Sequence, residues 1–212
     1  MADERQRERL VEALRERESL SERTLDAIRA VPRHEFVPPS ERDRAYDDTP
    51  LPIGHGQTIS APHMVAVMTD LLALSPGERV LEIGTGCGYH AAVTAEVVGQ
   101  ENVFSVEYHD DLATQARERL GELGYGGISV RSGDGREGWP AHAPYEKGYL
   151  TCAAEGFPDA LVEQIGPGGA LLGPIEEGSL AGGRQVLVRA RVDETGDLDR
   201  ERYGYVRFVP LQ

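Results

Sequence analysis

The stretch Arg79-Val-Leu-Glu-Ile-Gly-Thr-Gly-Cys-Gly-Tyr89 decides the fold of this chain. Its first five residues are mostly apolar and predict a buried parallel strand. The three glycines that follow allow the backbone to turn sharply and to approach a ligand closely. An Ala- and Val-rich stretch then runs to Val98 and predicts a helix ended by Gly99. A strand, a glycine turn and a helix N-terminus in this order predict a nucleotide-type binding site at the carboxyl end of the strand.

The glycine spacing narrows the class of ligand. It reads GxGxG, whereas dinucleotide-binding turns read GxGxxG, and the chain contains no GK[ST] phosphate loop. Glu82 stands next to the turn, where it would repel a phosphate but would suit a cationic ligand with a sulfonium or an amino group. Because a single glycine-rich turn is a weak signal, a plain tight turn explains it about equally well.

Acidic residues follow two further predicted strands. The strand at 103–106 ends at Glu107, about 20 residues after the glycine turn, where a carboxylate is placed to bind ribose hydroxyls. The strand at 128–131 is followed by Asp134, whose carboxylate could accept a hydrogen bond from an adenine amino group. With Glu82, three acids at three consecutive strand ends are hard to explain as a solvated surface. The pattern predicts a site for S-adenosylmethionine.

The remaining elements complete an α/β fold. Strands and helices alternate up to residue 173, which indicates a parallel sheet, and a final antiparallel pair makes the sheet mixed. In the second half we expect strands at 145–151 and 169–173, a helix at 158–165, and antiparallel strands at 185–192 and 203–209.

The region before the glycine turn predicts helices joined by irregular segments. Ser19 and Glu22 fit a capping box at the start of the second helix, and Ser60 is a candidate N-cap for the third. We expect helices at 3–18, 24–30 and 61–74. We also expect an extended packing strap at 31–38 and a Gly- and Pro-rich segment at 45–60 that is too irregular for a helix or a central strand.

The charge balance is strongly acidic. Asp and Glu number 36 against 22 Lys and Arg, a formal net charge of -14, and Lys147 is the only lysine. Such a surface is expected of a protein solvated in concentrated salt, so a halophilic archaeon is the preferred origin. A GC-rich genome also favours arginine over lysine, but it does not explain the acidic excess. The negative charge counts against a nucleic-acid partner.

The sequence also argues against several other classes of protein. It has no apolar run near 18 residues and no charged-then-apolar N-terminus, so we expect neither a membrane partner nor a signal peptide. Cys87 and Cys152 form no CxxC pair, which favours a reduced, cytoplasmic protein. The six histidines show no metal-ligand spacing, so no metal site is expected.

Several motifs together resemble the protein-L-isoaspartate O-methyltransferase family. The most specific is Leu51-Pro-Ile-Gly-His-Gly-Gln-Thr-Ile-Ser-Ala-Pro-His-Met64, flanked by Val31-Pro-Arg-His-Glu-Phe-Val-Pro38 and Leu81-Glu-Ile-Gly-Thr-Gly-Cys-Gly-Tyr89. The resemblance continues through Gly133-Asp-Gly135, Ala143-Pro-Tyr145, Pro167-Gly-Gly169 and Val206-Arg-Phe-Val-Pro-Leu211. It implies a single Rossmann-like methyltransferase domain over 1–212, with N-terminal helices and an active-site segment at 1–75 and the core at 76–212.

The resemblance also implies an activity, partners and site residues. The activity is methyl transfer from S-adenosylmethionine to isoaspartyl residues of damaged proteins, which begins their repair, and we expect a monomer. Ser60 resembles the residue usually called catalytic, and Ala153 and Ala154 would line the substrate groove with it. The residues implied to bind the cofactor are Thr58, Ile59, His63, Glu82, Gly84, Thr85, Gly86, Glu107, Asp134, Gly135 and Gln185.

The chemistry limits what Ser60 has to do. A carboxylate nucleophile has a free pKa near 4 and is already ionised at neutral pH, so the reaction needs no general base. Alignment and a dry pocket suffice, and proximity contributes up to roughly 7 to 11 kcal/mol. Ser60 is therefore expected to orient the carboxylate by a hydrogen bond; capping the helix at 61–74 is the structural alternative, and both roles can coexist.

Two other functions stay open on the sequence. The same fold serves methyltransferases of small molecules or nucleic acids, because fold does not determine substrate. Alternatively, the chain could bind the cofactor without catalysis. Glu155 and Gly156 motivate that alternative, since they replace the proline that usually follows the family's alanine run.

Overall fold

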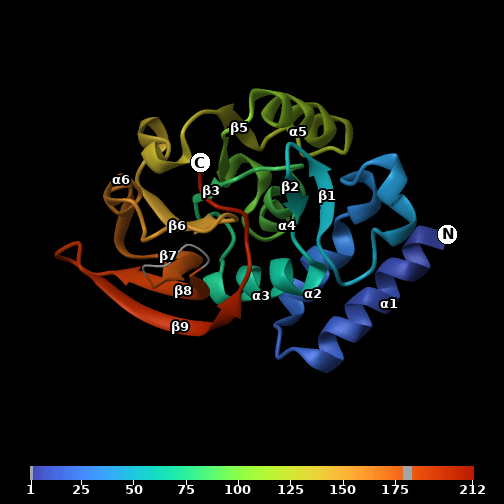
Figure 1. Ribbon diagram of the computed structural model, residues 1–212, viewed down its shortest axis with the longest axis horizontal. Helices are drawn as coiled ribbons and strands as arrows, with labels where there is room; N and C mark the ends of the chain where they lie inside the picture. The colour runs from blue at the N-terminus through green and yellow to red at the C-terminus, as the bar shows by residue number, and fades with distance from the viewer. Residues whose placement is uncertain (1, 179–182) are drawn as a thin grey trace.

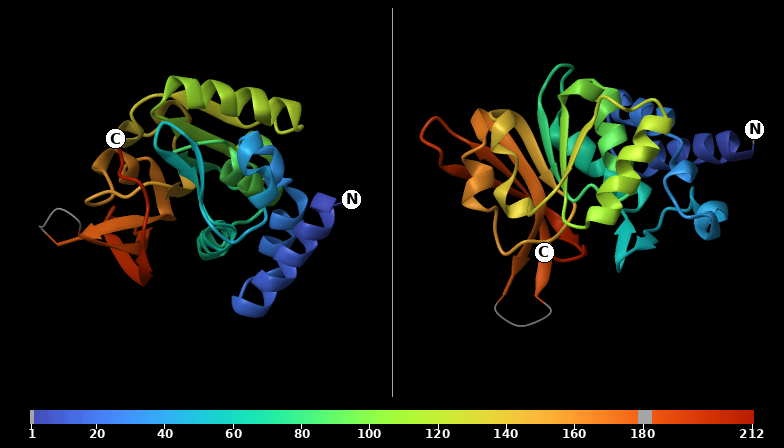
Figure 2. Two further views of the ribbon diagram at one scale, coloured as in Figure 1. Left: turned by 45° about the vertical axis from the view of Figure 1, so that its right-hand side comes forward. Right: turned by 90° about the horizontal axis from the view of Figure 1, so that it is seen from above.

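One seven-stranded sheet forms the centre of the protein (Figures 1 and 2). The structure is a computed structural model that describes residues 2–178 and 183–212. The strands of the sheet are β3 (Val80–Ile83), β4 (Val103–Glu107), β5 (Ser129–Ser132), β6 (Tyr145–Leu150), β7 (Ile165–Glu177), β8 (Arg184–Val192) and β9 (Leu198–Val206). Their order is β5-β4-β3-β6-β7-β8-β9; the first five are parallel, and β8 pairs antiparallel with both β7 and β9. The predicted α/β fold with a mixed, mostly parallel sheet is confirmed.

Helices cover both faces of the sheet because successive strand residues point to opposite sides. On β3, Val80 packs into a cluster with α1 to α5, whereas Leu81 packs into a second cluster with α6. Figure 1 shows α1 outermost, with α2 between it and the sheet. The helices are α1 (Ala2–Arg17), α2 (Glu22–Ala30), α3 (Pro62–Leu72), α4 (Tyr89–Val98), α5 (Asp110–Glu122) and α6 (Asp159–Val162).

A small hairpin lies apart from the main sheet. Strands β1 (Leu51–Gly54) and β2 (Gln57–Ile59) pair antiparallel within the segment expected to be irregular. The turn residues His55 and Gly56 have φ angles of 51° and 71°, and positive φ at both positions is the geometry of a tight two-residue hairpin. As expected, the segment contributes no strand to the central sheet.

Two N-terminal predictions were wrong in detail. Ser21, not Ser19, caps α2: its hydroxyl accepts a hydrogen bond of 3.3 Å from the backbone N–H of Thr24. The expected extended strap at 31–38 contains a short 3-10 helix, Arg33–Glu35, in which the Arg33 side chain is fully buried. The buried guanidinium donates a hydrogen bond to the Ala45 carbonyl at 2.8 Å.

The end of the chain also differs from the prediction. The helix expected at 158–165 is the single-turn α6, because Ile165 already pairs with Tyr145 as the start of β7. The last strand lies at Leu198–Val206, earlier than the expected 203–209. Its residues are mostly exposed and polar, so they lack the apolar alternation that marks a half-buried strand.

Candidate active site

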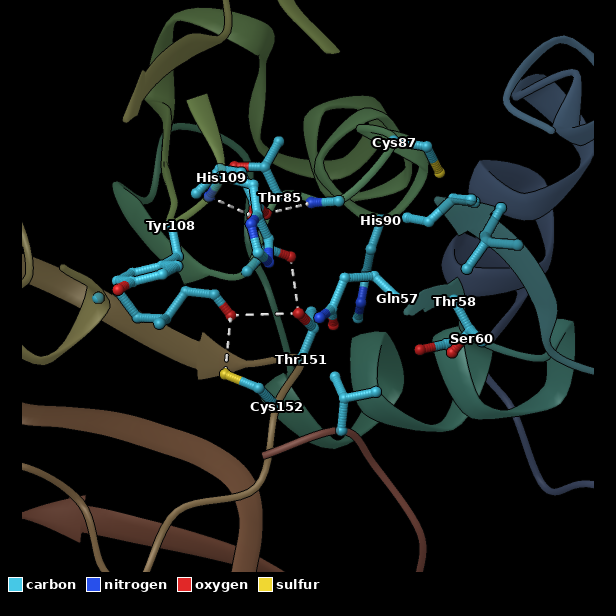
Figure 3. Close-up of a pocket in the computed structure, with 18 of the residues that line it drawn as sticks. Gln57, Thr58, Ser60, Thr85, Cys87, His90, Tyr108, His109, Thr151 and Cys152 are labelled. Carbon is cyan, nitrogen blue, oxygen red and sulfur yellow. Dashed lines mark hydrogen bonds between the residues drawn. The ribbon is translucent and has the colours of Figure 1, made fainter. Parts of the chain in front are cut away.

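A pocket lies at the carboxyl ends of β3, β4 and β6. It encloses about 760 Å³ of space, part of it open to solvent. The hairpin β1–β2 and the C-terminal residues 209–212 complete its walls. Figure 3 shows Ser60 and Tyr108 on opposite sides of this pocket. Strand ends of a parallel sheet thus meet segments from both ends of the chain.

Two glycines of this site stand where neighbouring side chains leave no room for a Cβ. Gly84 has a φ of 97°, and a Cβ on it would lie 2.2 Å from the Thr151 hydroxyl oxygen. A Cβ on Gly135 would lie 2.4 Å from the Ile83 side chain. Gly84, Thr85, Gly86 and Gly135, which were predicted to bind the cofactor, all line the pocket. Neighbouring side chains therefore pack directly against the backbone at Gly84 and Gly135.

Glu107 is the predicted acid that reaches the pocket. It lies at the end of β4 and is 5% exposed. Its two carboxylate oxygens accept hydrogen bonds from the backbone N–H groups of Gly86, at 2.8 Å, and of His109, at 3.0 Å. The carboxylate therefore holds the glycine turn against the end of β4 and fixes its own orientation toward the pocket.

Thr58 and Ile59 of the hairpin, with Ser60 directly after it, form one wall of the pocket. The capping alternative for Ser60 is not what the structure has, because Ala61 is the residue that precedes α3 and it makes no side-chain cap hydrogen bond. The carboxylate of Asp48 takes this position and accepts from the backbone N–H of His63 at 2.9 Å. The side chain of Ser60 is thus left for the pocket.

Glu82 lies off the pocket wall, contrary to the expectation that it meets the ligand. It is fully buried, and its carboxyl group is paired with the hydroxyls of Ser105 and of Tyr149, the latter at 2.9 Å. Both partners stand directly opposite Glu82 in neighbouring strands, so all three point to the face that α4 covers. Burial in this environment raises the pKa of Glu82 to about 8.

Three other predicted cofactor residues also lie outside the pocket lining. The Nδ1 atom of His63 is 2.8 Å from the Asp48 carboxylate. Asp134 pairs with Arg136 at 2.8 Å, which lowers the pKa of Asp134. The Gln185 amide bonds the backbone of Phe208 through both its donor and its acceptor, at 3.2 Å and 2.6 Å. Gln185 therefore holds the C-terminal segment whose next residues line the pocket.

The predicted substrate residues Ala153 and Ala154 are buried beside the pocket. Ala153 bridges to Pro210, and Ala154 bridges to Ile175. The preceding residues, Thr151 and Cys152, line the pocket in their place.

The structure adds residues to the site that the sequence reasoning missed. Tyr108 and His109 follow Glu107 directly, so the same strand-end signal could have found them. His90 lines the pocket from α4 and was considered only as a metal ligand. Within the described residues, no group of three or more His, Cys, Asp or Glu side chains could hold a metal ion. In the same part of the chain, no helix is long and apolar enough to cross a membrane.

Cys87 and Cys152 are free thiols on the pocket wall. Burial raises the pKa of both, that of Cys152 to about 12. A thiol is a weak nucleophile until it ionises, so neither is suited to covalent catalysis at neutral pH.

Comparison with known proteins agrees with this geometry. The family model for protein-L-isoaspartate(D-aspartate) O-methyltransferase matches residues 5–212. The protein-L-isoaspartate O-methyltransferase 2 of Archaeoglobus fulgidus is 52% identical over 207 residues, 97% of this chain and 92% of the relative. The enzyme of the same name from Methanothermobacter thermautotrophicus is 48% identical over 213 residues, covering 100% of this chain and 96% of its own.

Solved structures show the same similarity. A protein-L-isoaspartate O-methyltransferase superimposes with a TM-score of 0.86 at 29% identity, covering 96% of this chain and 65% of that chain. The corresponding Plasmodium falciparum protein, solved in complex with S-adenosyl-L-homocysteine, gives a TM-score of 0.84 at 25% identity. The match covers 97% of this chain and 98% of that chain. The chain belongs to the protein-L-isoaspartate(D-aspartate) O-methyltransferase family.

Proposed function

We infer that this protein is an S-adenosylmethionine-dependent protein-L-isoaspartate O-methyltransferase. The substrate is the free carboxylate of an isoaspartyl residue in a damaged protein. Full-length similarity to relatives of this name supports the assignment. The structural observation that carries it is the position of Ser60, which lines the pocket from the link between β2 and α3 and does not cap the helix.

The pocket fits the cofactor. A Cβ on Gly84 or Gly135 would collide with neighbouring side chains, so glycine is needed at these two positions of the pocket wall. Glu107 presents a carboxylate at the end of β4, suited to ribose hydroxyls. Apolar walls from Ile53 and Val106 suit an adenine ring and keep water out. When bound, S-adenosylmethionine supplies a methyl group on a sulfonium, which passes to a carboxylate oxygen while the carbon–sulfur electron pair returns to sulfur.

The protein's own contribution is positioning. The substrate carboxylate needs no base, because it is ionised at neutral pH. We propose that the Ser60 hydroxyl donates a hydrogen bond to one of its oxygens and leaves the other free to react. Thr58 and Ile59, which lie beside Ser60 on the same wall, would hold the adjoining peptide backbone. Alignment of this kind accounts for a large share of the rate in a reaction between two bound partners.

A methyl-transfer assay across substrate classes tests the assignment. The enzyme is incubated with S-adenosylmethionine and, separately, an isoaspartyl peptide, a duplex RNA and a small carboxylic acid. We expect methylation of the peptide alone, as a base-labile ester that releases methanol. Methylation of RNA or of the small acid in place of the peptide would contradict the assignment. An absence of transfer, together with intact cofactor binding, would support the non-catalytic alternative.

Four further expectations are proposals. We propose one domain over 1–212, with 1–75 as the N-terminal part and 76–212 as the core; a shared apolar cluster containing Leu10 and Leu187 supports it. We also propose a monomeric, cytoplasmic enzyme adapted to concentrated salt, which the acidic composition supports.

A further inference from the structure

His90 is a buried histidine that the proposed methyl transfer does not use. Its side chain is 6% exposed and lines the pocket, which it enters from α4 (Figure 3). The ring packs on Tyr149, with ring centroids 4.4 Å apart. Within the described residues, its Nδ1 atom is buried and has no hydrogen-bond partner. Because an unpaired buried polar atom is unfavourable, a partner on a ligand would stabilise this arrangement.

The other ring nitrogen fixes the tautomer of His90. Its Nε2 atom lies 3.2 Å from the Thr69 hydroxyl oxygen. That hydroxyl donates its single hydrogen to the Val65 carbonyl at 2.8 Å, so toward His90 it can only accept. The hydrogen of the imidazole is therefore on Nε2, and Nδ1 carries a lone pair. Burial lowers the pKa of His90 to about 3, so the ring stays neutral at physiological pH.

The sheet order places His90 at one end of the pocket. Strand β4 lies on one side of β3, and β6 lies on the other. Glu107, proposed to bind the ribose, belongs to the β4 side, whereas His90 packs on Tyr149 of β6. S-adenosylmethionine has hydrogen-bond donors on its adenine, its ribose and its α-ammonium group. With adenine and ribose on the β4 and β5 side, the α-ammonium group is the donor that remains for the β6 side.

Two polar groups near His90 on the β6 side, the Thr151 hydroxyl and the Glu82 carboxyl, are already engaged. The Thr151 hydroxyl donates to the Gly84 carbonyl at 2.6 Å. The carboxyl group of Glu82 lies off the wall and is paired with Tyr149 and Ser105. Among the described residues that line the pocket, the acidic side chain is Glu107, on the opposite side. The lone pair of His90 is therefore a free side-chain acceptor on the β6 side of the pocket.

We propose that Nδ1 of His90 accepts a hydrogen bond from the α-ammonium group of S-adenosylmethionine. The proposal rests on the proposed function, which supplies the cofactor. Neutrality of the ring is essential, because an imidazolium would repel the ammonium group. Thr69 contributes by holding the tautomer, and Tyr149 contributes by holding the ring plane.

Calorimetry with two ligands and two proteins tests this contact. The ligands are S-adenosyl-L-homocysteine and its analogue with hydrogen in place of the α-amino group. The wild type should prefer the first by about 10- to 150-fold, the range for a hydrogen bond to a charged group. In His90→Phe, which keeps an aromatic ring on Tyr149 but has no acceptor, the preference should fall to within about twofold. His142→Phe makes the same change outside the pocket and should keep the wild-type preference.

The outcomes separate this contact from the proposed function. An unchanged preference in His90→Phe, or equal binding of both ligands by the wild type, would overturn the contact alone. Failure of the wild type to bind S-adenosyl-L-homocysteine would overturn the proposed function and the contact together.

Nitrogen NMR of the wild type gives a test that needs no variant. In the free protein, the His90 resonances should report the Nε2–H tautomer. The Nδ1 resonance should shift when S-adenosyl-L-homocysteine is added and should respond much less to the deaminated analogue. An equal response to both ligands, or the opposite tautomer, would overturn the proposal.

Discussion

The hydroxyl of Tyr149 donates a hydrogen bond of 2.9 Å to the carboxyl group of Glu82, two residues before the glycine turn begins. Ser105 pairs with the same carboxyl from the other side, so one row of polar side chains crosses β4, β3 and β6. Thr94 of α4 extends the row by a 3.0 Å contact to the Tyr149 hydroxyl. The carboxyl thus ties three strands and a helix together under the pocket without an ion pair to a described residue.

Glu82 makes stability depend on pH in a definite direction. Burial raises its pKa from the ordinary 4.5 to about 8, so between these values the folded protein keeps a proton that the unfolded chain has lost. Its contribution to stability is therefore complete below about pH 4 and is lost as the pH rises to about 8. Glu82→Gln has no proton to lose. Urea unfolding at about pH 5 and about pH 8 measures the free energy of unfolding of both proteins. Relative to the wild type, the variant should be more stable at the higher pH than at the lower one. A difference that is the same at both values would contradict the buried, protonated carboxyl.

Glu107 and Asp134 provide a matched pair of acids at neighbouring strand ends. Glu107→Ala should weaken S-adenosylmethionine binding by about 1.5 to 3 kcal/mol, because a ribose hydroxyl loses a charged acceptor. Asp134→Ala should weaken it much less, since that carboxylate lies off the wall and is paired with Arg136. Calorimetry measures the loss of cofactor affinity in both variants. Equal losses would mean that Asp134 turns into the pocket on binding, and no loss in Glu107→Ala would remove Glu107 from the site.

Ser60 and Asp48 separate catalysis from helix capping. Ser60→Ala should lower turnover on an isoaspartyl peptide while changing neither the melting temperature nor cofactor affinity appreciably. Asp48→Ala removes the carboxylate that accepts from the His63 N–H, which should cost about 1 kcal/mol and about 2 to 4 °C in melting temperature. Thermal unfolding and steady-state kinetics on both variants show which residue caps the helix and which one acts in methyl transfer. A lower melting temperature in Ser60→Ala with unchanged turnover would reverse the two roles.

Salt should stabilise this protein. At a net charge of -14, carboxylates repel one another over a Debye length of about 30 Å at 0.01 M salt, which falls to about 3 Å at 1 M. Melting temperature and methyl transfer should therefore both rise from dilute buffer into molar KCl, the second also because an anionic substrate approaches an acidic protein. Flat or falling profiles in both would contradict adaptation to salt and would leave the enzymatic assignment untouched.

Strand ends could be predicted from the sequence, but side-chain direction could not always be. Gly84, Gly135 and Glu107 lie on the pocket wall because each follows or ends a buried strand, which is a local pattern. The prediction that Glu82 meets the ligand fails for an equally local reason. It lies between Leu81 and Ile83, which face the other side of the sheet, so alternation turns it toward α4 and away from the ligand.

Contacts between distant segments left no signal in the sequence. Asp48 caps α3 from 15 residues away, and Gln185 holds Phe208 from another strand. The bridge between Ala153 and Pro210 brings the C-terminal segment over the pocket. No periodicity or spacing encodes such pairings, because they depend on how the finished elements pack.

The most direct test compares two peptides that differ only in the linkage of one aspartyl residue. Initial rates of methyl transfer from S-adenosylmethionine are measured for the isoaspartyl form and for the normal form, with base-labile methyl ester as the product. The protein should methylate the isoaspartyl peptide, with Ser60→Ala greatly reducing that rate, and should leave the normal peptide essentially unmethylated. Equal rates on both peptides, or transfer to neither while S-adenosylmethionine binds normally, would contradict the assignment.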